Sequence, residues 1–331
     1  MIHIDGSYGE GGGQIIRTAV ALSAITGKPC TIDKIRYNRP KPGLQAQHLA
    51  AVRAVAELCD TTVKGRIGDT SLYFEPQKIK GGDYNIDIGT AGSISLVLQS
   101  LILPSLHAKK TVSLNITGGT HVRWSPSMDY MHHIFVYYMK KLGLDVSIEV
   151  GRYGFYPKGD GLVNVKIKPG ITRPLCLTER GELAGYYAAS MASEDLQKAK
   201  VAERQVKAVS LKLNGKSVQY VKSLSPGSSI HLSALYDNCI LGSSEIGERG
   251  KKAEDVGKDA TKDLEKEISG DACLDSHMAD QILPFLAFAK GESIISVAEV
   301  TEHVKTNIWV IGQFLPVKFD VDKEKIITVS P

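Results

Sequence analysis

Apolar residues alternate between strand-like and helix-like spacing along most of the chain, and the order of the predicted elements repeats. Residues 2–35 predict a strand, a glycine-rich turn, a helix and a second strand, and residues 84–117 and 293–321 predict the same order. Each unit has a further predicted helix with apolar residues three to four positions apart; these helices are residues 43–59, 128–143 and 278–291. Similar units indicate a body built by duplication. We therefore predict an α/β (α+β) fold of three units, each with two helices and a four-stranded sheet.

One segment, residues 182–271, departs from this order and predicts a small inserted α/β domain. Its pattern favours a strand at 182–190, a helix at 194–213, hairpin strands at 217–224 and 228–236, and a charged helix at 251–269. The charged run in the last helix is typical of a solvated surface. The main body then comprises residues 1–181 and 272–331.

The composition is that of an ordinary globular protein. Of the 331 residues, 43% are hydrophobic and 23% are charged. The net charge of +4 permits an anionic partner without requiring nucleic acid. No apolar run is long enough to span a membrane, so we expect no membrane association.

The cysteines and the first residues bear on the cellular compartment. Five cysteines are scattered along the chain, and none forms a C-x-x-C pair. An odd, scattered set is typical of reduced thiols rather than of disulfides or zinc ligands. The first residues also show no charged-then-apolar signal segment. We therefore expect a cytoplasmic protein.

The stretch DGSYGEGGGQIIRT, residues 5–18, contains five glycines in the turn before the first helix. A glycine-rich loop at a helix N-terminus favours anions, because free N–H groups point outward there. The stretch matches neither G-x-x-x-x-G-K-[ST] nor G-x-G-x-x-G. Glu10 lies inside the loop and would repel a phosphate. Arg17, which we place in the first turn of the helix, opposes the helix dipole and would be favoured by a nearby anion.

A second candidate segment is the basic loop RYNRPKPGLQAQH, residues 36–48. Arg36, Arg39 and Lys41 lie among prolines and a glycine, and Gln47 and His48 follow in the first turns of the next predicted helix. Guanidinium groups suit phosphate oxygens. An exposed basic loop without a ligand is the alternative interpretation.

The third candidate segment is TEHVKTN, residues 301–307, which occupies the same strand-to-helix position in the third unit as the glycine-rich loop in the first. His303 then lies at or near a helix N-terminus, which lowers an imidazole pKa and leaves a free lone pair. A neutral imidazole can act as base, metal ligand or nucleophile; a capping or structural role is the alternative. His132 and His133 have no evident partner, and we expect core or surface roles for them.

Five stretches together resemble the RNA 3′-terminal phosphate cyclase family. They are DGSYGEGGGQIIRTAVALSAITGKP, RPKPGLQAQHL, GGDYNIDIGTAGSISLVLQ, GFYPKGDG and TEHVKTNIWVIGQFLPV. The resemblance covers essentially the whole chain. It implies a body of three repeated units, related to a translation initiation factor domain and to enolpyruvyl transferases, interrupted by a small inserted domain.

The resemblance also implies a reaction in three steps. A histidine attacks the α-phosphorus of ATP and releases pyrophosphate, the AMP passes to the 3′-terminal phosphate of RNA, and the neighbouring 2′-hydroxyl closes a 2′,3′-cyclic phosphate. His303 matches the histidine of this reaction. Glu10 matches the residue implied to hold a divalent cation, Mg²⁺ or Mn²⁺, on ATP. RNA with a 3′-terminal phosphate is the implied partner, and a homodimer is left open.

Further positions carry over from the family's motifs. Those placed around ATP or the RNA phosphate are Gln14, Arg17, Arg36, Arg39, Gln47 and His48. Those placed beside the adenosine are Pro126, Tyr130, His277, Asp280 and Gln281. The family often has tyrosine where His277 stands, and an imidazole can also stack on adenine.

Three alternatives compete with this interpretation. The first is a non-catalytic, cyclase-like protein that binds RNA or assists ribosome assembly; the presence of His303, Glu10 and Arg17 argues against it. The second is an enolpyruvyl transferase, which rests on analogy between folds alone. The third is an RNA-binding module without catalysis, for which the small net charge gives little support.

Overall fold

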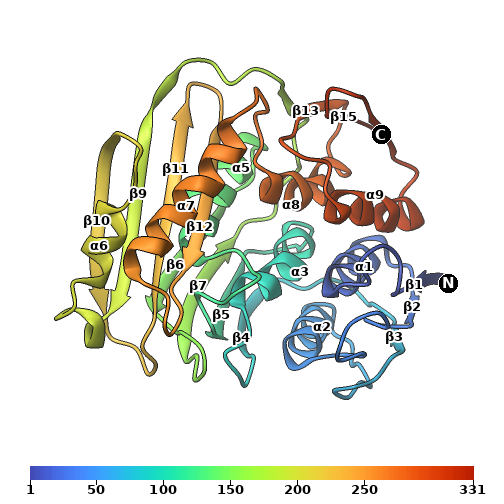
Figure 1. Cartoon of the computed structure of the whole chain (residues 1–331). Helices are drawn as coiled ribbons and strands as arrows, with labels where there is room; N and C mark the ends of the chain where they lie inside the picture. The colour runs from blue at the N-terminus through green and yellow to red at the C-terminus, as the bar shows by residue number, and fades with distance from the viewer.

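A computed structural model describes residues 1–331, the whole chain (Figure 1). The helical segments are α1 (Gly13–Thr26), α2 (Ala46–Leu58), α3 (Ile94–Leu106), α4 (Met128–Tyr130), the π-helix η1 (Met131–Phe135), α5 (Val136–Lys141), the short 3₁₀-helix η2 (Glu194–Leu196), α6 (Val201–Lys207), α7 (Ala253–Ile268), α8 (Ser276–Leu286) and α9 (Glu302–Phe314). The strands are β1 (Ile2–Asp5), β2 (Cys30–Asp33), β3 (Leu72–Phe74), β4 (Gly82–Asp87), β5 (Val112–Gly118), β6 (Val146–Arg152), β7 (Gly161–Ile167), β8 (Cys176–Leu177), β9 (Leu183–Ser193), β10 (Leu213–Val221), β11 (Ser228–Tyr236), β12 (Ile240–Ile246), β13 (Ser293–Ser296), β14 (Lys318–Val321) and β15 (Ile326–Ser330).

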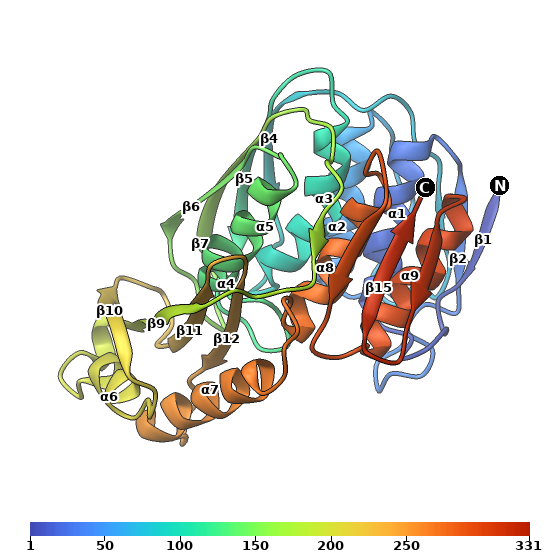
Figure 2. The ribbon, with the colours of Figure 1, turned by 90° about the horizontal axis from the view of Figure 1, so that it is seen from above.

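Three sheets and their helices make up the larger part of the molecule. The strand orders are β1-β2-β3, β4-β5-β7-β6 and β14-β15-β13-β8. Helices α1, α2, α3, α8 and α9 contact one another in the middle, with the sheets toward the outside (Figure 2). A single hydrophobic core of 70 buried residues runs through all three groups. Burial of that apolar surface is the main force that holds them together.

The mixed α/β architecture that the sequence predicts is confirmed. The first sheet nevertheless has three strands rather than four, because β3 is the last strand to pair there and only with β2. Two helices are followed by a glycine with left-handed backbone angles, a conformation that glycine adopts without steric cost. Gly27 (φ 66°) follows α1, and Gly143 (φ 77°) follows α5. Repetition of the three units by duplication stays a prediction.

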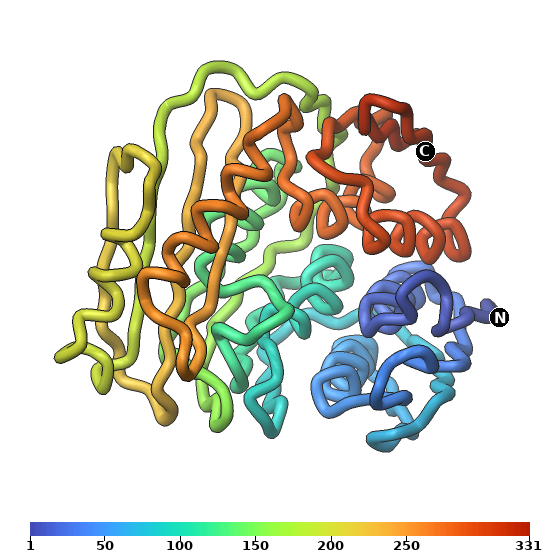
Figure 3. The backbone as a smooth tube through the Cα atoms, viewed as in Figure 1, coloured from blue at the N-terminus to red at the C-terminus, as the bar shows by residue number.

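Residues 183–268 form a fourth sheet, with the order β10-β9-β11-β12 and two helices, α6 and α7, on one face. In Figure 3 the chain runs from the third sheet across the top of the molecule to reach this part. Alternation along β11 directs Ile230, Leu232 and Ala234 toward the helices, where they join a core of eight buried residues. The opposite face carries His231 and Ser233. The division of the chain into domains stays a prediction.

Two expectations for this segment are wrong. The helix at 194–213 is interrupted, because Lys200 has left-handed backbone angles (φ 49°) and α6 spans only Val201–Lys207. Strands β10 and β11 form no hairpin with each other; both pair with β9, β10 in parallel and β11 antiparallel. The true hairpin joins β11 to β12, a strand that the pattern missed.

The TEHVKTN segment is helical, whereas the sequence predicts a loop before the helix. Helix α9 begins at Glu302, since the Thr301 hydroxyl accepts a hydrogen bond from the Val304 N–H (3.2 Å) and caps its first turn.

None of the helices is both long and apolar enough to cross a membrane.

Candidate functional site

The glycine-rich loop and the first turn of α9 lie against each other. Tyr8 in the loop stacks on Trp309 of α9, with ring centroids 4.0 Å apart. Gly9 has a φ of +55°, and a Cβ there would lie 2.9 Å from the Thr306 hydroxyl oxygen. Only glycine therefore permits this close approach. The two turns that the sequence places at equivalent positions do face each other.

Gln14 fixes the protonation of His303. Its side-chain nitrogen donates to two acceptors, the backbone oxygen of His303 (3.0 Å) and the Asp280 carboxylate (3.2 Å). The amide oxygen of Gln14 therefore faces the Nδ1 of His303, 2.6 Å away. That oxygen only accepts, so Nδ1 carries the proton. In the neutral ring the lone pair is then on Nε2, the nitrogen nearer Glu10.

His303 is neutral near pH 7 in this environment. Burial lowers the pKa of its imidazole below the usual value, and the charges of Arg17 and Arg39 lower it further. Glu10 acts in the opposite direction, with a carboxylate oxygen 3.7 Å from Nε2. The side chain is 47% exposed, so a ligand can reach it. A half-exposed imidazole with a free lone pair can act as a nucleophile.

Arg17 is buried without a full set of partners. Helix α1 begins at Gly13, which makes Arg17 its fifth residue and puts it past the predicted first turn. Its Nε has no hydrogen-bond partner, and burial lowers its pKa to about 10. The nearest counter-charge is Asp280, whose own pKa burial raises to about 7. A buried cation with so weak a counter-ion favours a bound anion.

Predicted residues of the basic loop also contact the glycine-rich loop. Arg39 forms an ion pair with Glu10 (2.9 Å). Burial lowers the pKa of His48 to about 3, and the charges of Arg17 and Arg36 contribute. A Cβ at position 13 would collide with the His48 ring, so glycine is required there too. Gln47 lies further out, where it accepts the Ser93 N–H at 3.4 Å.

The residues predicted beside adenosine lie along α4 and α8. His277 and Asp280 belong to the first turns of α8, and Gln281 donates to the His277 backbone oxygen (2.8 Å). Tyr130 is only 2% exposed and lies behind His277, with ring centroids 6.2 Å apart. Pro126 precedes α4, and its backbone oxygen accepts from the Ser95 hydroxyl (2.7 Å). The roles of these residues toward a ligand stay predictions.

Sequence reasoning missed two residues that hold this arrangement together. Asp275 caps α8, accepting from the His277 and Met278 N–H groups, and also accepts from the Tyr130 hydroxyl (2.6 Å). Asn307 accepts from the Thr18 hydroxyl (2.8 Å) and donates to the Asp280 backbone oxygen (2.7 Å). An Asp-Ser pair before a helix is a capping signal, whereas nothing in the sequence marks Asn307.

Comparison with known proteins identifies the family. A model of the family described as RNA 3′-terminal phosphate cyclase matches residues 8–321. The chain belongs to the RNA 3′-terminal phosphate cyclase family. Cyclases of that name from Pyrococcus furiosus and Methanopyrus kandleri are each 45% identical to it, over 97% of this chain and 95% of theirs. The one from Archaeoglobus fulgidus is 41% identical over 98% of this chain and 99% of its own.

This member of the cyclase family has no protein-only metal centre. No group of three or more His, Cys, Asp or Glu side chains is placed to hold an ion. Glu10 is a single half-exposed carboxylate that forms an ion pair with Arg39. A hard cation held here would need further oxygen ligands, such as those of a triphosphate. Glu10 is therefore too small a donor set to hold a hard cation by itself.

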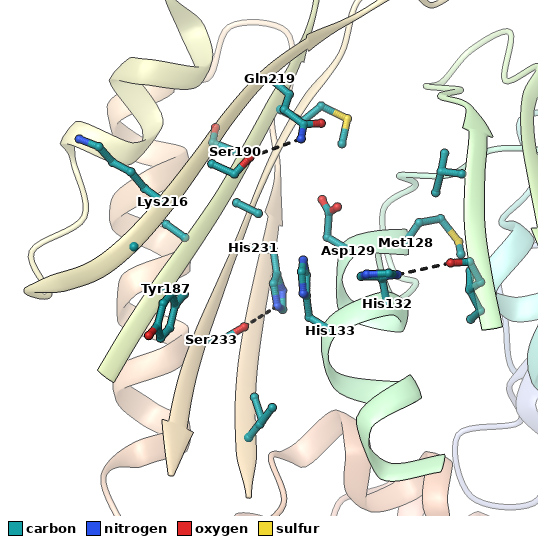
Figure 4. Close-up of a pocket in the computed structure, with 18 of the residues that line it drawn as sticks. Met128, Asp129, His132, His133, Tyr187, Ser190, Lys216, Gln219, His231 and Ser233 are labelled. Atoms are coloured by element: carbon teal, nitrogen blue, oxygen red, sulfur yellow. Dashed lines mark hydrogen bonds between the residues drawn. The ribbon is translucent and has the colours of Figure 1, made fainter. Parts of the chain in front are cut away.

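A separate cavity of this cyclase-family protein lies between η1 and the fourth sheet (Figure 4). It measures about 710 Å³. His133 stacks on His231, with ring centroids 5.5 Å apart, and His132 lies next to it. The sequence shows no evident partner for His133 because His231 comes from a strand distant in sequence. The centroid of the Tyr130 ring is 6.1 Å from that of His231, which lines this cavity, and 6.2 Å from that of His277.

Proposed function

We propose that this protein uses ATP to convert an RNA 3′-terminal phosphate into a 2′,3′-cyclic phosphate through a covalent histidine–AMP at His303. One observation carries the proposal: Gln14 holds the imidazole so that Nε2 has the lone pair, beside the buried cation Arg17. The names of the relatives support the overall conversion. The chemistry of the residues supports the covalent route.

The proposed steps conserve bonds and charge. The Nε2 lone pair of His303 forms a bond to the α-phosphorus of ATP, and the bond to pyrophosphate breaks. An oxygen of the RNA 3′-phosphate then attacks the same phosphorus, and the imidazole leaves with its electron pair. The RNA 2′-hydroxyl next attacks the activated 3′-phosphorus, loses its proton, and expels AMP. A good nucleophile that is also a good leaving group divides one difficult displacement into easier ones.

The other residues position and neutralise charge in this proposal. Arg17, Arg36 and Arg39 would contact phosphate oxygens from two sides of the loop, which suits the fork geometry of guanidinium groups. A divalent cation supplies further charge neutralisation at the triphosphate when it is bound. Glu10 would hold that cation, which explains an acidic residue inside an anion-binding loop. His277 and Pro126 would flank the adenine.

Labelling by radioactive ATP tests the proposal. The wild-type protein, incubated with α-labelled ATP and Mg²⁺ or Mn²⁺, is expected to acquire label that is labile to acid and stable to base, as a phosphoramidate is. Added RNA with a 3′-phosphate should remove the label and yield a cyclic end. A wild-type protein that takes up no label would contradict the enzyme proposal and favour the non-catalytic relative.

The rate of labelling should be level between about pH 7 and 9 and fall only at a pH below the usual imidazole pKa. The physical reason is the lowered pKa of His303: only the neutral ring attacks, and it gains a proton as the pH falls through that pKa. Single-turnover labelling across pH measures it. Burial also raises the pKa of Asp280, in the same site, to about 7. Asp280→Asn is therefore the control, and its labelling rate should still fall at acidic pH. A rate that still climbs from pH 7 to 9 would contradict a neutral His303.

Replacing Glu10 with glutamine should slow labelling about 10- to 100-fold, by analogy with the loss of groups that support a metal site. Raising the Mn²⁺ concentration should restore part of the rate, because the variant binds the ion more weakly. Glu302→Gln is the matched control: that carboxylate neighbours His303 but pairs with Lys305 (2.7 Å). Equal metal dependence in wild type and Glu10→Gln would remove Glu10 from the metal role.

A further inference from the structure

Trp124 is held in solvent by a strained backbone. Its side chain belongs to the loop between β5 and α4, and the residue is 89% exposed, the largest exposed fraction of any large hydrophobic residue in the protein. Its φ is +60°, in the left-handed region that bulky residues avoid. Strain and exposure of this kind persist where the rest of the structure enforces them, often at binding sites. Neither the core nor the proposed chemistry at His303 uses this indole.

Arg123 fixes one side of the indole. Its guanidinium lies over the Trp124 ring, 4.9 Å from the centroid. It also pairs with Glu248 (2.8 Å), in the loop that follows β12. The side chain is still 52% exposed, so it retains donors for a ligand. A planar cation beside an exposed aromatic ring is a common arrangement in proteins that bind single-stranded nucleic acid.

A second exposed aromatic lies on the adjacent segment. The Thr120 N–H donates to the Gly154 oxygen (2.9 Å), and His121 bridges in parallel to Phe155. The residue after Phe155 is Tyr156, which is 75% exposed, and Lys158 two positions later is exposed as well. We name the set Arg123, Trp124, Tyr156 and Lys158 the Trp124 platform. It presents two aromatic rings and two cations with no carboxylate among its members.

The platform is linked through the chain and two hydrogen bonds to the edge of the candidate site. Trp124 precedes Pro126 by two residues, and the Pro126 oxygen is tied to Ser95 in the first turn of α3. That turn begins at Ser93, whose N–H donates to Gln47 (3.4 Å) at the edge of the basic cluster. Trp124 therefore lies on the segment that leads to Pro126, one of the residues that we predict beside the adenosine.

We propose that the Trp124 platform binds the single-stranded RNA that leads to the 3′-phosphate, stacking one or two bases on Trp124 and Tyr156. This inference rests on the proposed function, since it assumes an RNA substrate. Bases of every kind have a face that stacks on aromatic rings, so the platform would tolerate many sequences. Arg123 and Lys158 would contact neighbouring phosphates. A protein partner is less favoured, because lysine, present here as Lys158, is depleted at interfaces of that kind.

Binding of a fluorescein-labelled RNA decamer with a 3′-phosphate, followed by anisotropy, tests the inference. Trp124→Ala should raise the dissociation constant about tenfold, in line with loss of one stacked base, and Trp124→Phe should recover most of the affinity. Labelling of His303 by ATP without RNA should be unchanged in both variants. Tyr73→Ala is the matched control: Tyr73 is a 46% exposed aromatic on β3 and should bind RNA like wild type.

Intrinsic fluorescence gives an independent measurement. The chain has two tryptophans, and Trp309 is half-buried against Tyr8. RNA should quench the wild-type signal more than that of Trp124→Phe, where only Trp309 remains. Equal RNA affinity and equal quenching in wild type and Trp124→Ala, with His303 labelling intact, would overturn the inference while leaving the proposed function standing. Loss of labelling in the wild type would instead contradict the proposed function itself.

Discussion

Replacing His303 with alanine is expected to abolish transfer of AMP to the protein, lowering labelling by more than about a thousandfold. The neighbouring nucleophiles are carboxylates and two histidines. His48 is buried with its Nδ1 occupied by the Gln45 N–H, and we place His277 beside the adenosine rather than at the α-phosphorus. Conversion of RNA 3′-phosphate to the cyclic end should fall with it, because the second step needs the covalent AMP. Gel autoradiography and end analysis of the RNA measure the two losses.

The control for this variant is His3→Ala, which removes an exposed histidine on β1 and should label normally. Circular dichroism should show the same fold for both variants, since His303 is half exposed and contributes little to the core. Label that persists in His303→Ala would remove this histidine from the nucleophile role. Chemical mapping of the labelled residue would then identify the real acceptor.

Replacing Arg17 with methionine should weaken ATP binding and stabilise the free protein. A buried arginine that contacts an anion contributes about 2–5 kcal/mol to its binding, so the dissociation constant should rise at least about thirtyfold. The free protein loses a buried cation whose Nε has no partner, and apolar replacement of buried charges stabilises by about 1–4 kcal/mol. Asp280 tolerates the change, because without Arg17 its pKa rises further and it stays protonated.

Calorimetric titration with ATP and thermal unfolding measure the two effects on the same samples. Arg53→Met is the matched control: Arg53 is an exposed arginine on α2, and its removal should change neither quantity appreciably. Unchanged ATP affinity together with a lower melting temperature would mean that Arg17 is structural. Opposite changes in affinity and stability are the signature of a site that is strained until its ligand binds.

The fold was predictable where local pattern and tertiary environment agree. Helices α1, α3, α7 and α8 have strong apolar spacing or a clear capping residue, and they lie close to where the sequence predicts them. The errors in strand pairing are in the segment 183–268. The order of strands in a sheet depends on which edges meet, and β10 pairs with β9 rather than with its neighbour in sequence. A left-handed residue such as Lys200 gives no periodic signal at all.

The candidate site was predictable as a set of residues but not as a geometry. Glycine spacing, the basic loop and the histidine at a helix start indicate an anion and a nucleophile. The proton on Nδ1 follows only from the contact between Gln14 and His303, 289 positions apart. The unpartnered Nε of Arg17 follows only from burial. Nothing in the sequence indicates that Tyr130 is buried next to His277, where it is only 2% exposed, rather than accessible to a ligand.

By itself, the sequence determined the class of fold, the existence of the glycine-rich loop and the identity of the groups that can hold phosphate or attack it. Those features depend on residue type and short spacing, which act locally along the chain. Only the tertiary structure decided which histidine nitrogen is free, why Arg17 is an unsatisfied cation, and that Trp124 is exposed to solvent. These properties depend on distances between residues far apart in sequence and on the exclusion of water, and both arise only when the chain has packed.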